Sequence, residues 1–535
     1  ADVADAVALM IEQAYEDYRE VLGHDLTTVI PVIVYASHND FQQTNVTLTH
    51  VGESVGGFTE LFKNRVVVPF TGSYADLRHV VYHELVHVFM FDVVYGGLVR
   101  SVIRQAYMNP VPLWFTEGLA EYVSQGWDAE AEMILRDLTV SDQVVPLEYL
   151  YGGYLVYKEG QSVMTFIAER YGRNKIAEIV KSLAKTQNLD RSLSEAVGLT
   201  TPELSEAWED WLRERYWPRV EVLDRGRDIG RLVTDHTKDG SYLNLGPSIS
   251  PDGSRVVYVT DRSGYADIKV ASTLDGRVLA TLVRGGRSDE FEQLHILRTG
   301  FGWSPDGASV CFVTKAGESD ALHFVGVENG ELERSLTFEL DGMYTPSWSP
   351  DGERVVFVGT KDGASDLYVT DIEGKSLSRL TDDFFDERDP VWSPDGTRIA
   401  FSSDRGSESE LGFRRRYDLY TVDPETRRIE RLPSTPENDS SPTWSPDGET
   451  IVFSSTAGGS PDLYALSLDD SSITRLTAFV GGAESPSWAR TSDWMVYSLY
   501  SNVGWDIAAV KDPLVRLPEA VGTLPPVEPL DRPGV

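Results

Sequence analysis

Hydrophobic and polar positions change their spacing along the chain at about residue 220. Before that point, apolar residues recur every three or four positions, which predicts amphipathic helices. The first predicted helix is marked by six apolar or aromatic positions: Val7, Met10, Ile11, Ala14, Tyr15 and Tyr18. A longer helix is predicted over about 74–93, and further helices follow almost to Trp217. Strand-like runs at 29–35 and within 56–70 add a small sheet, so this part is predicted to be an α-rich α+β domain.

After about residue 228 the pattern becomes one of short alternating strands separated by turns rich in Gly, Pro, Asp and Ser. The tetrapeptide Ser-Pro-Asp-Gly recurs five times, and a degenerate sixth copy follows. The aspartates of the six copies are Asp252, Asp306, Asp351, Asp395, Asp447 and Asp493. Asp-rich turns could suggest calcium binding, but we expect these aspartates to bond the backbone of their own turns. Repeats of roughly 45–55 residues with four strands each are typical of propeller blades, so six blades are predicted.

The last repeat ends in its third strand, residues 505–510, and no clear fourth strand follows it. Residues 230–235 precede the first repeat and have the sequence character of a fourth strand. We therefore expect this segment to complete the sixth blade and close the ring. The predicted organisation is a helical domain over 1–220, a linker over 221–228, an all-β propeller over 229–522 and a Pro-rich tail over 523–535.

The intact turns and their spacing resemble the TolB-type β-propeller repeat. In that family the propeller is a protein-binding or substrate-gating module, and the repeats do not distinguish these roles from a plain scaffold. TolB-like propellers occur mostly in exported bacterial proteins. Together with Ala1 at the start, this resemblance favours a secreted or periplasmic location with the export signal already removed. A cytoplasmic enzyme is the alternative.

Composition narrows the range of partners. The 48 basic and 84 acidic residues give a formal net charge of −36, which disfavours nucleic acid because phosphates would be repelled. No segment has the ~20 consecutive apolar residues of a membrane span. The single cysteine, Cys311, lies in an apolar run. We expect it to be a buried hydrophobic side chain rather than a reactive thiol.

Candidate chemistry lies within the predicted long helix, in the segment His83-Glu84-Leu85-Val86-His87. Two imidazoles four residues apart fall on one helix face and can bind one Zn²⁺, and Glu84 can reach a water on that ion. This HExxH pattern predicts a metallopeptidase with Glu84 as general base. His79 lies one turn earlier but is about 12 Å along the axis from His87, at ~1.5 Å per residue. We expect His79 to pack beside the site.

A second segment, Pro112-Leu113-Trp114-Phe115-Thr116-Glu117-Gly118-Leu119-Ala120-Glu121-Tyr122, follows downstream. It resembles the Glu-ligand segment of gluzincin metallopeptidases, the group that includes thermolysin and aminopeptidase N. The resemblance implies that Glu117 is the third zinc ligand and that Glu121 orients a zinc-bound imidazole. Three protein ligands leave one position for water, which is typical of a catalytic zinc site.

The predicted mechanism also needs a donor to the oxyanion and a strand that binds the substrate. Tyr151, Tyr154 and Tyr157 follow the ligand helix, and each could donate a hydrogen bond to the oxyanion. We choose Tyr157, whose segment resembles the one downstream of the zinc helices in related bacterial peptidases; a tyrosine that only packs is the alternative. Residues 56–60 are the candidate edge strand for an extended peptide substrate, with Glu60 as either a substrate contact or a solvated carboxylate.

The sequence thus predicts a zinc-dependent enzyme that hydrolyses peptide or protein substrates through a Glu-activated, zinc-bound water. The propeller would restrict substrate entry or bind a protein partner. The rival hypothesis is a catalytically inactive, peptidase-like protein that acts as a propeller-based adaptor. The residues that the mechanism needs, His83, Glu84, His87 and Glu117, are all present.

Overall fold

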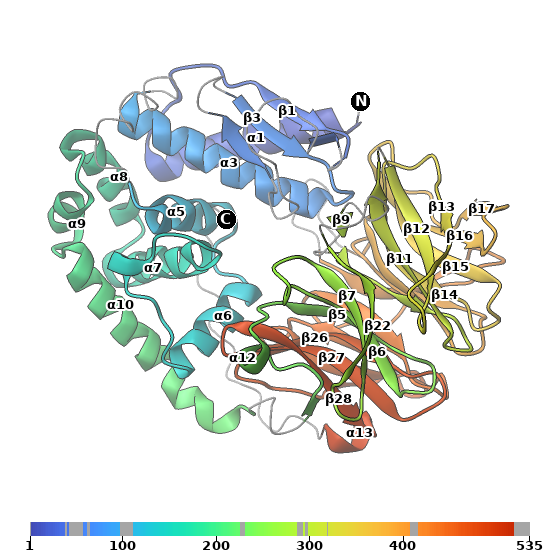
Figure 1. Ribbon diagram of the computed structural model, residues 1–535. Coiled ribbons are helices and arrows are strands. Elements are labelled where there is room, and N and C mark those ends of the chain that lie inside the picture. The colour runs from blue at the N-terminus through green and yellow to red at the C-terminus, as the bar shows by residue number, and fades with distance from the viewer. Residues whose placement is uncertain are drawn as a thin grey trace. The chain divides into compact units, whose positions relative to one another are not determined.

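The computed structural model describes residues 2–37, 40–41, 57–60, 65–96, 111–224, 230–285, 293–294, 298–317, 319–406 and 416–517. The chain divides into two compact units, one ending at Glu221 and the other beginning at Val222. The first unit is helical with a small sheet, and the second is built of β-sheets (Figure 1). The predicted fold class is confirmed. The linker predicted over 221–228 is only partly described, and the tail over 523–535 lies outside the described residues.

Apart from the central helix α3, mostly amphipathic segments form the helices of the first unit. Their bounds are α1 (Asp2–Leu22), α3 (Tyr74–Tyr95), α5 (Leu113–Gln125), α6 (Ala129–Val140), α7 (Leu155–Tyr171), α8 (Asn174–Thr186), α9 (Leu189–Val197) and α10 (Thr201–Tyr216), with 3-10 turns η1 (Leu147–Tyr149) and η2 (Trp217–Val222). The predicted first and long helices correspond to α1 and α3. Most of α3 is buried on all sides, as expected of a helix at the centre of its unit. Among the described helices, none has the length and apolar character needed to cross a bilayer.

A three-stranded sheet lies beside α3. Its strands are β1 (Val32–Tyr35), β2 (Phe58–Glu60) and β3 (Arg65–Pro69), in the order β1-β3-β2. β3 pairs parallel with β1 and antiparallel with β2. Both β2 and β3 contact α3, so the outer strand β2 runs next to the helix with the HExxH segment.

Helices α5 and α7 lie against each other in the first unit (Figure 1). Glycine on each helix allows the close approach. A Cβ added to Gly118 would lie 2.2 Å from the carbonyl carbon of Gly160, and one added to Gly160 would lie 2.2 Å from the backbone oxygen of Trp114. Ordinary carbon contacts are ~3.5–4.0 Å, so any larger residue would push the helices apart. This crossing places the first turns of α7 beside the ligand helix α5.

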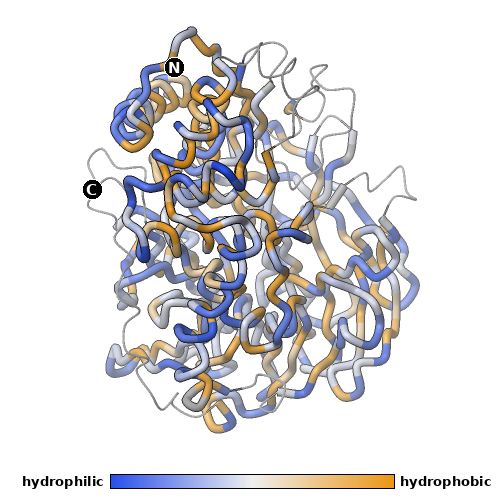
Figure 2. Tube along the Cα trace, turned by 90° about the vertical axis from the view of Figure 1, so that its left-hand side faces the viewer, coloured by the Kyte–Doolittle hydropathy of each residue, from blue (hydrophilic) through white to orange (hydrophobic). Residues whose placement is uncertain are grey.

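The second unit contains, among its described residues, six sheets of blade form. The first three consist of β5 (Asn244–Ile249), β6 (Arg255–Thr260), β7 (Asp267–Ser272) and β8 (Val278–Val283); β10 (Gly302–Trp303), β11 (Ser309–Ala316), β12 (Ser319–Gly326) and β13 (Leu332–Leu336), with β9 (Gln293–Leu294) beside β11; and β14 (Gly342–Trp348), β15 (Arg354–Lys361), β16 (Ala364–Asp371) and β17 (Leu377–Arg379). Hydrophobic and hydrophilic stretches alternate along the strands (Figure 2).

The remaining sheets follow the same strand order. They consist of β18 (Glu387–Trp392), β19 (Ile399–Ser403), β20 (Asp418–Val422) and β21 (Ile429–Arg431); β22 (Asp439–Trp444), β23 (Thr450–Ser455), β24 (Asp462–Ser467) and β25 (Ile473–Arg475); and β26 (Gly482–Trp488), β27 (Trp494–Ser501), β28 (Gly504–Lys511) and β4 (Arg231–Leu232). Short helices α12 (His236–Asp239) and α13 (Pro513–Arg516) contact β28. The predicted number of blades is therefore confirmed.

The aspartates of the five intact turns bond within their own turns, as predicted, whereas no such bond is found for Asp493 among the described residues. Asp252 Oδ1 accepts hydrogen bonds from Ser250 Oγ at 2.6 Å and from the backbone N–H of Ser254 at 3.1 Å. The other four intact copies repeat both contacts, through Asp306, Asp351, Asp395 and Asp447. The repeated motif therefore stabilises a turn.

The last sheet is completed from the N-terminal side of the repeats. Strand β4 pairs antiparallel with β28, which confirms the predicted ring closure. A side-chain contact inside other blades recurs at this seam. Within the fifth blade, Thr477 Oγ1 donates to Asp462 Oδ1 at 2.8 Å, and at the seam Thr234 Oγ1 donates to Asp506 Oδ1 at 3.0 Å. Strand β4 therefore takes the place of the sixth blade's own fourth strand, and Thr234 takes that of the threonine which follows this strand.

Candidate metal centre

The long helix α3 presents two converging imidazoles. The helix begins at the cap residue Ser73, whose Oγ accepts a hydrogen bond from the N–H of Asp76 at 3.2 Å, and ends at Gly96 with φ of 73°. His83 and His87 lie one turn apart on the same face, and their Nε2 atoms are 3.2 Å apart. The two residues are only 9% and 7% exposed. Both rings are thus held in nearly fixed positions by the surrounding core.

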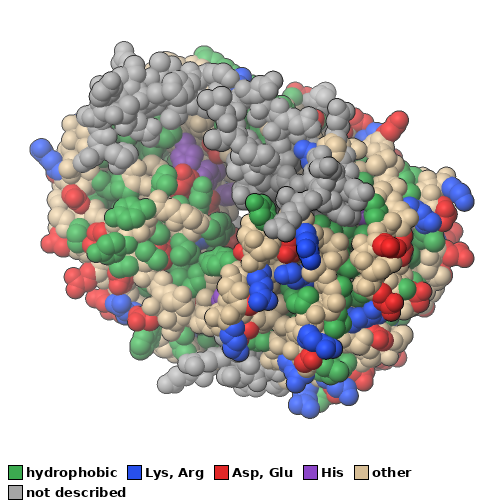
Figure 3. Space-filling view, in the orientation of Figure 1, with side chains coloured by type: hydrophobic (Ala, Val, Ile, Leu, Met, Phe, Trp, Pro, Cys, Tyr) green, Lys and Arg blue, Asp and Glu red, His purple; other side chains and the backbone are tan. Residues whose placement is uncertain are grey.

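Helix α5 brings a carboxylate to the same point. Glu117 Oε2 lies 3.2 Å from His83 Nε2 and 3.2 Å from His87 Nε2, so the three atoms form an equilateral triangle. Ligand atoms ~2.0–2.1 Å from a tetrahedral zinc ion would lie ~3.3–3.4 Å from one another. This donor set therefore fits a zinc ion and could hold a metal. Histidine side chains are visible in a recess with acidic side chains nearby (Figure 3).

Electrostatics around the triangle favour a positive charge. Burial alone would lower the pKa of His83, but hydrogen bonds to Glu117 and Glu121 raise it to about 10. Burial would raise the pKa of Glu117, whereas its contacts with His83 and His87 lower it to about 2. Carboxylates that stabilise a cationic imidazole so strongly would also stabilise a metal cation at the same place.

Glu121 meets the opposite edge of the His83 ring. Its Oε1 lies 3.0 Å from His83 Nδ1, while its Oε2 accepts hydrogen bonds from Gln125 Nε2 at 2.7 Å and Lys158 Nζ at 3.1 Å. Burial opposes ionisation, but Lys158 and the neighbouring histidines hold the pKa of Glu121 below its usual range. A carboxylate at Nδ1 selects the tautomer whose Nε2 lone pair faces the triangle.

Lys158 is buried, with 3% of its surface exposed, and joins Glu121 to the next helix. Its Nζ lies 3.2 Å from Asp128 Oδ2 and 3.4 Å from Glu130 Oε2.

His79 Nε2 is 3.5 Å from Glu121 Oε1, so His79 lies beside the triangle and not in it. This matches the supporting position that its spacing from His87 predicts.

Glu84 is tied to the edge strand β2. Thr59 Oγ1 donates a hydrogen bond to Glu84 Oε2 at 2.7 Å and lies 3.3 Å from the backbone oxygen of Glu84. The bond fixes the orientation of a carboxylate that is only 7% exposed. Within the candidate substrate strand, residue 56 and the side chain of Glu60 lie outside the described residues.

The three candidate tyrosines lie in different surroundings. The ring of Tyr157 stacks on His83, with centroids 6.0 Å apart and planes inclined by 29°. Burial and three neighbouring carboxylates raise the pKa of Tyr157 to about 12. Tyr154 is half exposed and donates to Glu130 Oε1 at 2.7 Å, and Tyr151 is 75% exposed. Of the three, Tyr157 contacts the candidate metal ligands.

Thr59 and Lys158 are site residues that the sequence reasoning missed. Thr59 lies in a short strand with no motif, so nothing in its local sequence points to Glu84. Lys158 lies in a helix of mixed polar and apolar residues, so its local sequence does not show that it is buried. A lysine buried in such a helix needs a charged partner.

Comparison with known families agrees with this geometry. Residues 11–214 match the Peptidase MA superfamily, and residues 299–412 and 412–513 match the TolB beta propeller domain. The chain joins a Peptidase MA superfamily domain to a TolB-like propeller. Both resemblances inferred from the sequence are thus confirmed at the family level. The His83, His87 and Glu117 triangle lies inside the Peptidase MA domain, which supports a peptidase-like protein with a propeller module.

Several solved structures are similar to part of this chain. TolB from Acinetobacter baumannii has 20% sequence identity, with 49% of this chain and 65% of that chain covered and a TM-score of 0.38. The putative TolB from Agrobacterium tumefaciens has 21% identity, covering 50% and 90%, with a TM-score of 0.38. Oligogalacturonate lyase from Vibrio parahaemolyticus has 14% identity, covering 52% and 93%, with a TM-score of 0.36. This chain therefore spans less than two thirds of the A. baumannii protein.

Proposed function

We propose that this protein is a zinc-dependent metallopeptidase in which His83, His87 and Glu117 hold the metal. The observation that carries the proposal is the triangle of donor atoms with 3.2 Å sides, which fits tetrahedral zinc. The Peptidase MA match over residues 11–214 supports it independently. The substrate class is peptides or proteins.

Zinc bound at the triangle would acidify a water and polarise the substrate carbonyl. Glu84 takes a proton from the attacking water and delivers it to the leaving amine nitrogen. Thr59 holds Glu84 Oε2 by a 2.7 Å hydrogen bond, which orients the carboxylate for this transfer. Glu121 keeps the proton of His83 on Nδ1, so that Nε2 is available as a ligand atom.

Tyr157 is the proposed donor to the developing oxyanion. Its ring stacks on His83, and its phenol O–H can donate a hydrogen bond at neutral pH. The edge strand β2 is the proposed site of substrate pairing, because an extended peptide can add to an exposed sheet edge through main-chain hydrogen bonds. The bond between Thr59 and Glu84 connects this strand to the general base.

The propeller is proposed to restrict substrate entry or to bind a protein partner. A secreted or periplasmic location is proposed as well, on the strength of the TolB-like repeats and the net charge of −36. Gating predicts that short peptides are cleaved much faster than casein. Equal cleavage of both would argue for protein binding as the propeller's role.

The proposal is tested by measuring zinc and hydrolysis in the same preparation. We expect stoichiometric zinc by elemental analysis and cleavage of a peptide library. Glu84→Gln should keep the zinc and lose the activity, because the amide preserves shape but cannot accept the proton. An inactive adaptor would show no hydrolysis in the wild type. An active Glu84→Gln enzyme would exclude Glu84 as the general base.

A further inference from the structure

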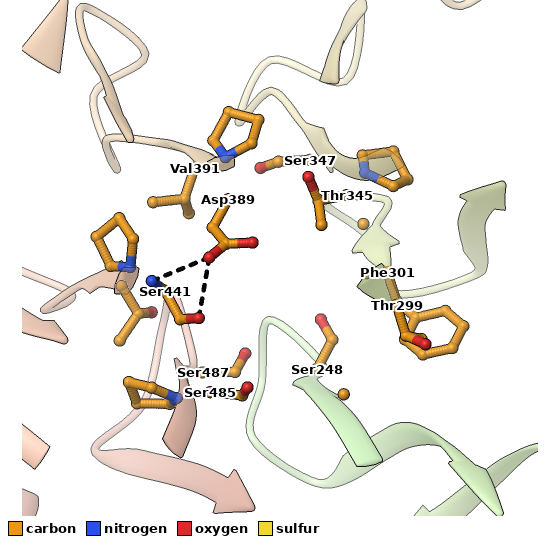
Figure 4. Close-up of a pocket in the computed structure, with 18 of the residues that line it drawn as sticks. Ser248, Thr299, Phe301, Thr345, Ser347, Asp389, Val391, Ser441, Ser485 and Ser487 are labelled. Carbon is orange, nitrogen blue, oxygen red and sulfur yellow. Dashed lines mark hydrogen bonds between the residues drawn. The ribbon is translucent and has the colours of Figure 1, made fainter. Parts of the chain in front are cut away.

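A cavity of about 430 Å³ lies among the first strands of the six propeller blades. Side chains from all of these strands surround an open centre (Figure 4). Serine and threonine hydroxyls are the most numerous polar side-chain groups at the wall, and they include those of Ser248, Thr299, Thr345, Ser441 and Ser485. The volume falls in the range of ~300–1,000 Å³ that is typical of small-ligand sites.

The backbone around this cavity is strained. Thr345, Asp389, Ser441 and Ser485 have φ values of 45°, 51°, 51° and 53°, in the left-handed region that disfavours residues other than glycine. Each precedes a proline, and each coincides with a break in the register of its strand pair. Strain of this kind persists where the surrounding structure enforces it, and it clusters at functional sites.

One blade departs from the repeat at this cavity. The turn residue that is proline in five blades (Pro251, Pro305, Pro350, Pro394 and Pro446) is Arg490 in the sixth. The backbone aligns the positions, because Ala489 N–H bonds the oxygen of Trp494 as Ser250 N–H bonds that of Arg255. Arg490 Nη2 donates to the backbone oxygen of Trp348 in the third blade, and the residue lines the cavity.

Arg490 carries a charge that no ion pair among the described residues balances. Its Nη1 is buried and has no hydrogen-bond partner there. Burial lowers the pKa of Arg490 to about 10, more than Cys311 and Asp351 raise it. A lowered pKa is the expected result for a cation that the protein compensates incompletely.

The other charged groups described at the wall differ from Arg490. Arg388 Nε lies 2.9 Å from Asp386 Oδ2, and Arg298 lies 3.9 Å from the same oxygen. Asp389 Oδ2 accepts hydrogen bonds from both the N–H and the Oγ of Ser441 at 3.1 Å. Glu387 pairs with Arg405. Among the cations described at this wall, Arg490 is the one with no ion pair.

We propose that the central cavity of the propeller binds a carboxylate at the end of an extended peptide, with Arg490 as the counter-charge. A guanidinium has five N–H donors in a planar fork that matches a carboxylate, and the Trp348 oxygen uses only part of this capacity. One guanidinium without an ion pair can match one carboxylate. A dianion such as phosphate would place a second negative charge near Asp389 and Glu484.

The hydroxyl-rich wall suits the rest of such a ligand, because serine and threonine hydroxyls can donate to and accept from peptide groups. This site is separate from the candidate metal centre, and the inference does not depend on peptidase activity.

The test is calorimetric titration of the full chain with acetyl-trialanine and with its C-terminal amide. All variants carry Glu84→Gln, so that the probe is not cleaved. Arg490→Gln removes the charge, and Arg490→Lys retains it. Arg255→Gln is the matched control, because Arg255 also donates to a backbone oxygen of another blade, that of Gly307 at 2.8 Å, but does not line the cavity. Succinate and sulfate distinguish a general anion site from a peptide site.

We expect the parent and Arg255→Gln to bind the acid at least about tenfold more tightly than the amide. Arg490→Gln should lose this preference, and Arg490→Lys should keep part of it. Equal binding of acid and amide by the parent, no binding of either, or a preference that survives Arg490→Gln would each overturn the proposal. Tighter binding of sulfate than of the peptide acid would also overturn it. If Arg490→Gln does not fold, the test uses the parent and Arg490→Lys. The proposal then requires that the parent prefers the acid to the amide and that Arg490→Lys keeps only part of this preference.

Discussion

Glu117 and Glu121 lie one turn apart on α5, yet their carboxylates meet different atoms. Glu117 lies 3.2 Å from the Nε2 atoms of His83 and His87, and Glu121 lies 3.0 Å from Nδ1 of His83. Residues four apart share a helix face and are ~6 Å apart along the axis, so the two carboxylates can reach opposite edges of one ring. At the scale of the residue, this geometry favours metal binding for Glu117 and ring orientation for Glu121.

The two glutamates should therefore respond differently to replacement by alanine. Glu117→Ala removes an anionic ligand and should lose zinc during dialysis against a mild chelator. Glu121→Ala should retain metal more often and lose ~10–100-fold in affinity or activity. Elemental analysis of both variants at equal concentration and pH measures the difference. A metal-free Glu121→Ala beside a fully loaded Glu117→Ala would mean that the two roles are reversed.

Thr59 should affect catalysis through Glu84 alone. Thr59→Val removes the hydroxyl that donates to Glu84 Oε2 at 2.7 Å and keeps the side-chain shape. A hydrogen bond to a charged group is worth about 1.5–3 kcal/mol, so kcat should fall by roughly 10- to 100-fold while zinc content stays constant. Thr59→Ser should restore part of the rate. Thr165→Val is the control, since Thr165 Oγ1 bonds only a helix carbonyl, that of Gln161. Equal rates in Thr59→Val and Thr165→Val would refute the role.

Glu159 should make stability depend on pH. It is fully buried, and its Oε1 accepts from the N–H of Val145 at 3.0 Å. Burial raises the pKa of Glu159 to about 8, against ~4.3 in an unfolded chain. Between these values the folded protein keeps a proton that the unfolded chain releases, so this contribution to stability is lost as pH rises towards 8. Glu159→Gln should flatten the fall in unfolding temperature between pH 5 and 8. An unchanged slope in the variant would contradict this assignment.

At the scale of the element, residue spacing along a helix predicted which side chains share one face of that helix. The HExxH spacing puts His83 and His87 on one face whatever surrounds it, and the same holds for Glu117 and Glu121 on α5. Thr59 on β2 and Lys158 on α7 were out of reach, because their positions depend on how distant elements pack. No local pattern encodes that packing.

In the propeller, too, the sequence predicted local features but not those that depend on how strands pair. Its repeats predicted the blades and the closing strand, because each turn has the same sequence signature. They did not predict the strained residues at the cavity. A residue before proline is normally read as extended, whereas Thr345 and Ser441 precede proline with φ of 45° and 51°. The register break that enforces this conformation belongs to the strand pair and not to the segment alone.

The crossing of α5 and α7 should tolerate no larger residue. Gly118→Ala would place a methyl group 2.2 Å from the backbone of Gly160, so the helices must separate. We expect a loss of about 1–3 kcal/mol in unfolding free energy, together with weaker zinc binding, because Glu117 and Glu121 flank the crossing. Gly152→Ala is the control, since a Cβ there would meet nothing within 4 Å. Similar unfolding curves for the two variants would show that the crossing is not tightly packed.

At the scale of the whole molecule, the chain is two compact units, and the second is closed by residues far apart in sequence. Thr234 and Asp506, which meet at the seam, are 272 positions apart. A contact of this span adds nothing to any single repeat, but it prevents the first and last blades from separating. The stability of the ring should therefore depend strongly on this seam.

Asp506→Ala should weaken the propeller selectively. Asp506 is fully buried, and it accepts from Thr234 Oγ1 at 3.0 Å and from the N–H of His236 at 2.8 Å. Removing its carboxylate leaves these groups buried without an acceptor, at a cost on the order of 3 kcal/mol. Calorimetry should show two unfolding transitions, and only the one assigned to the propeller should move to lower temperature. Asp470→Ala is the control, because the Asp470 carboxylate bonds Ser472 within an exposed turn and lies away from the seam. If Asp506→Ala leaves both transitions in place, or shifts them equally, the seam does not control the stability of the ring.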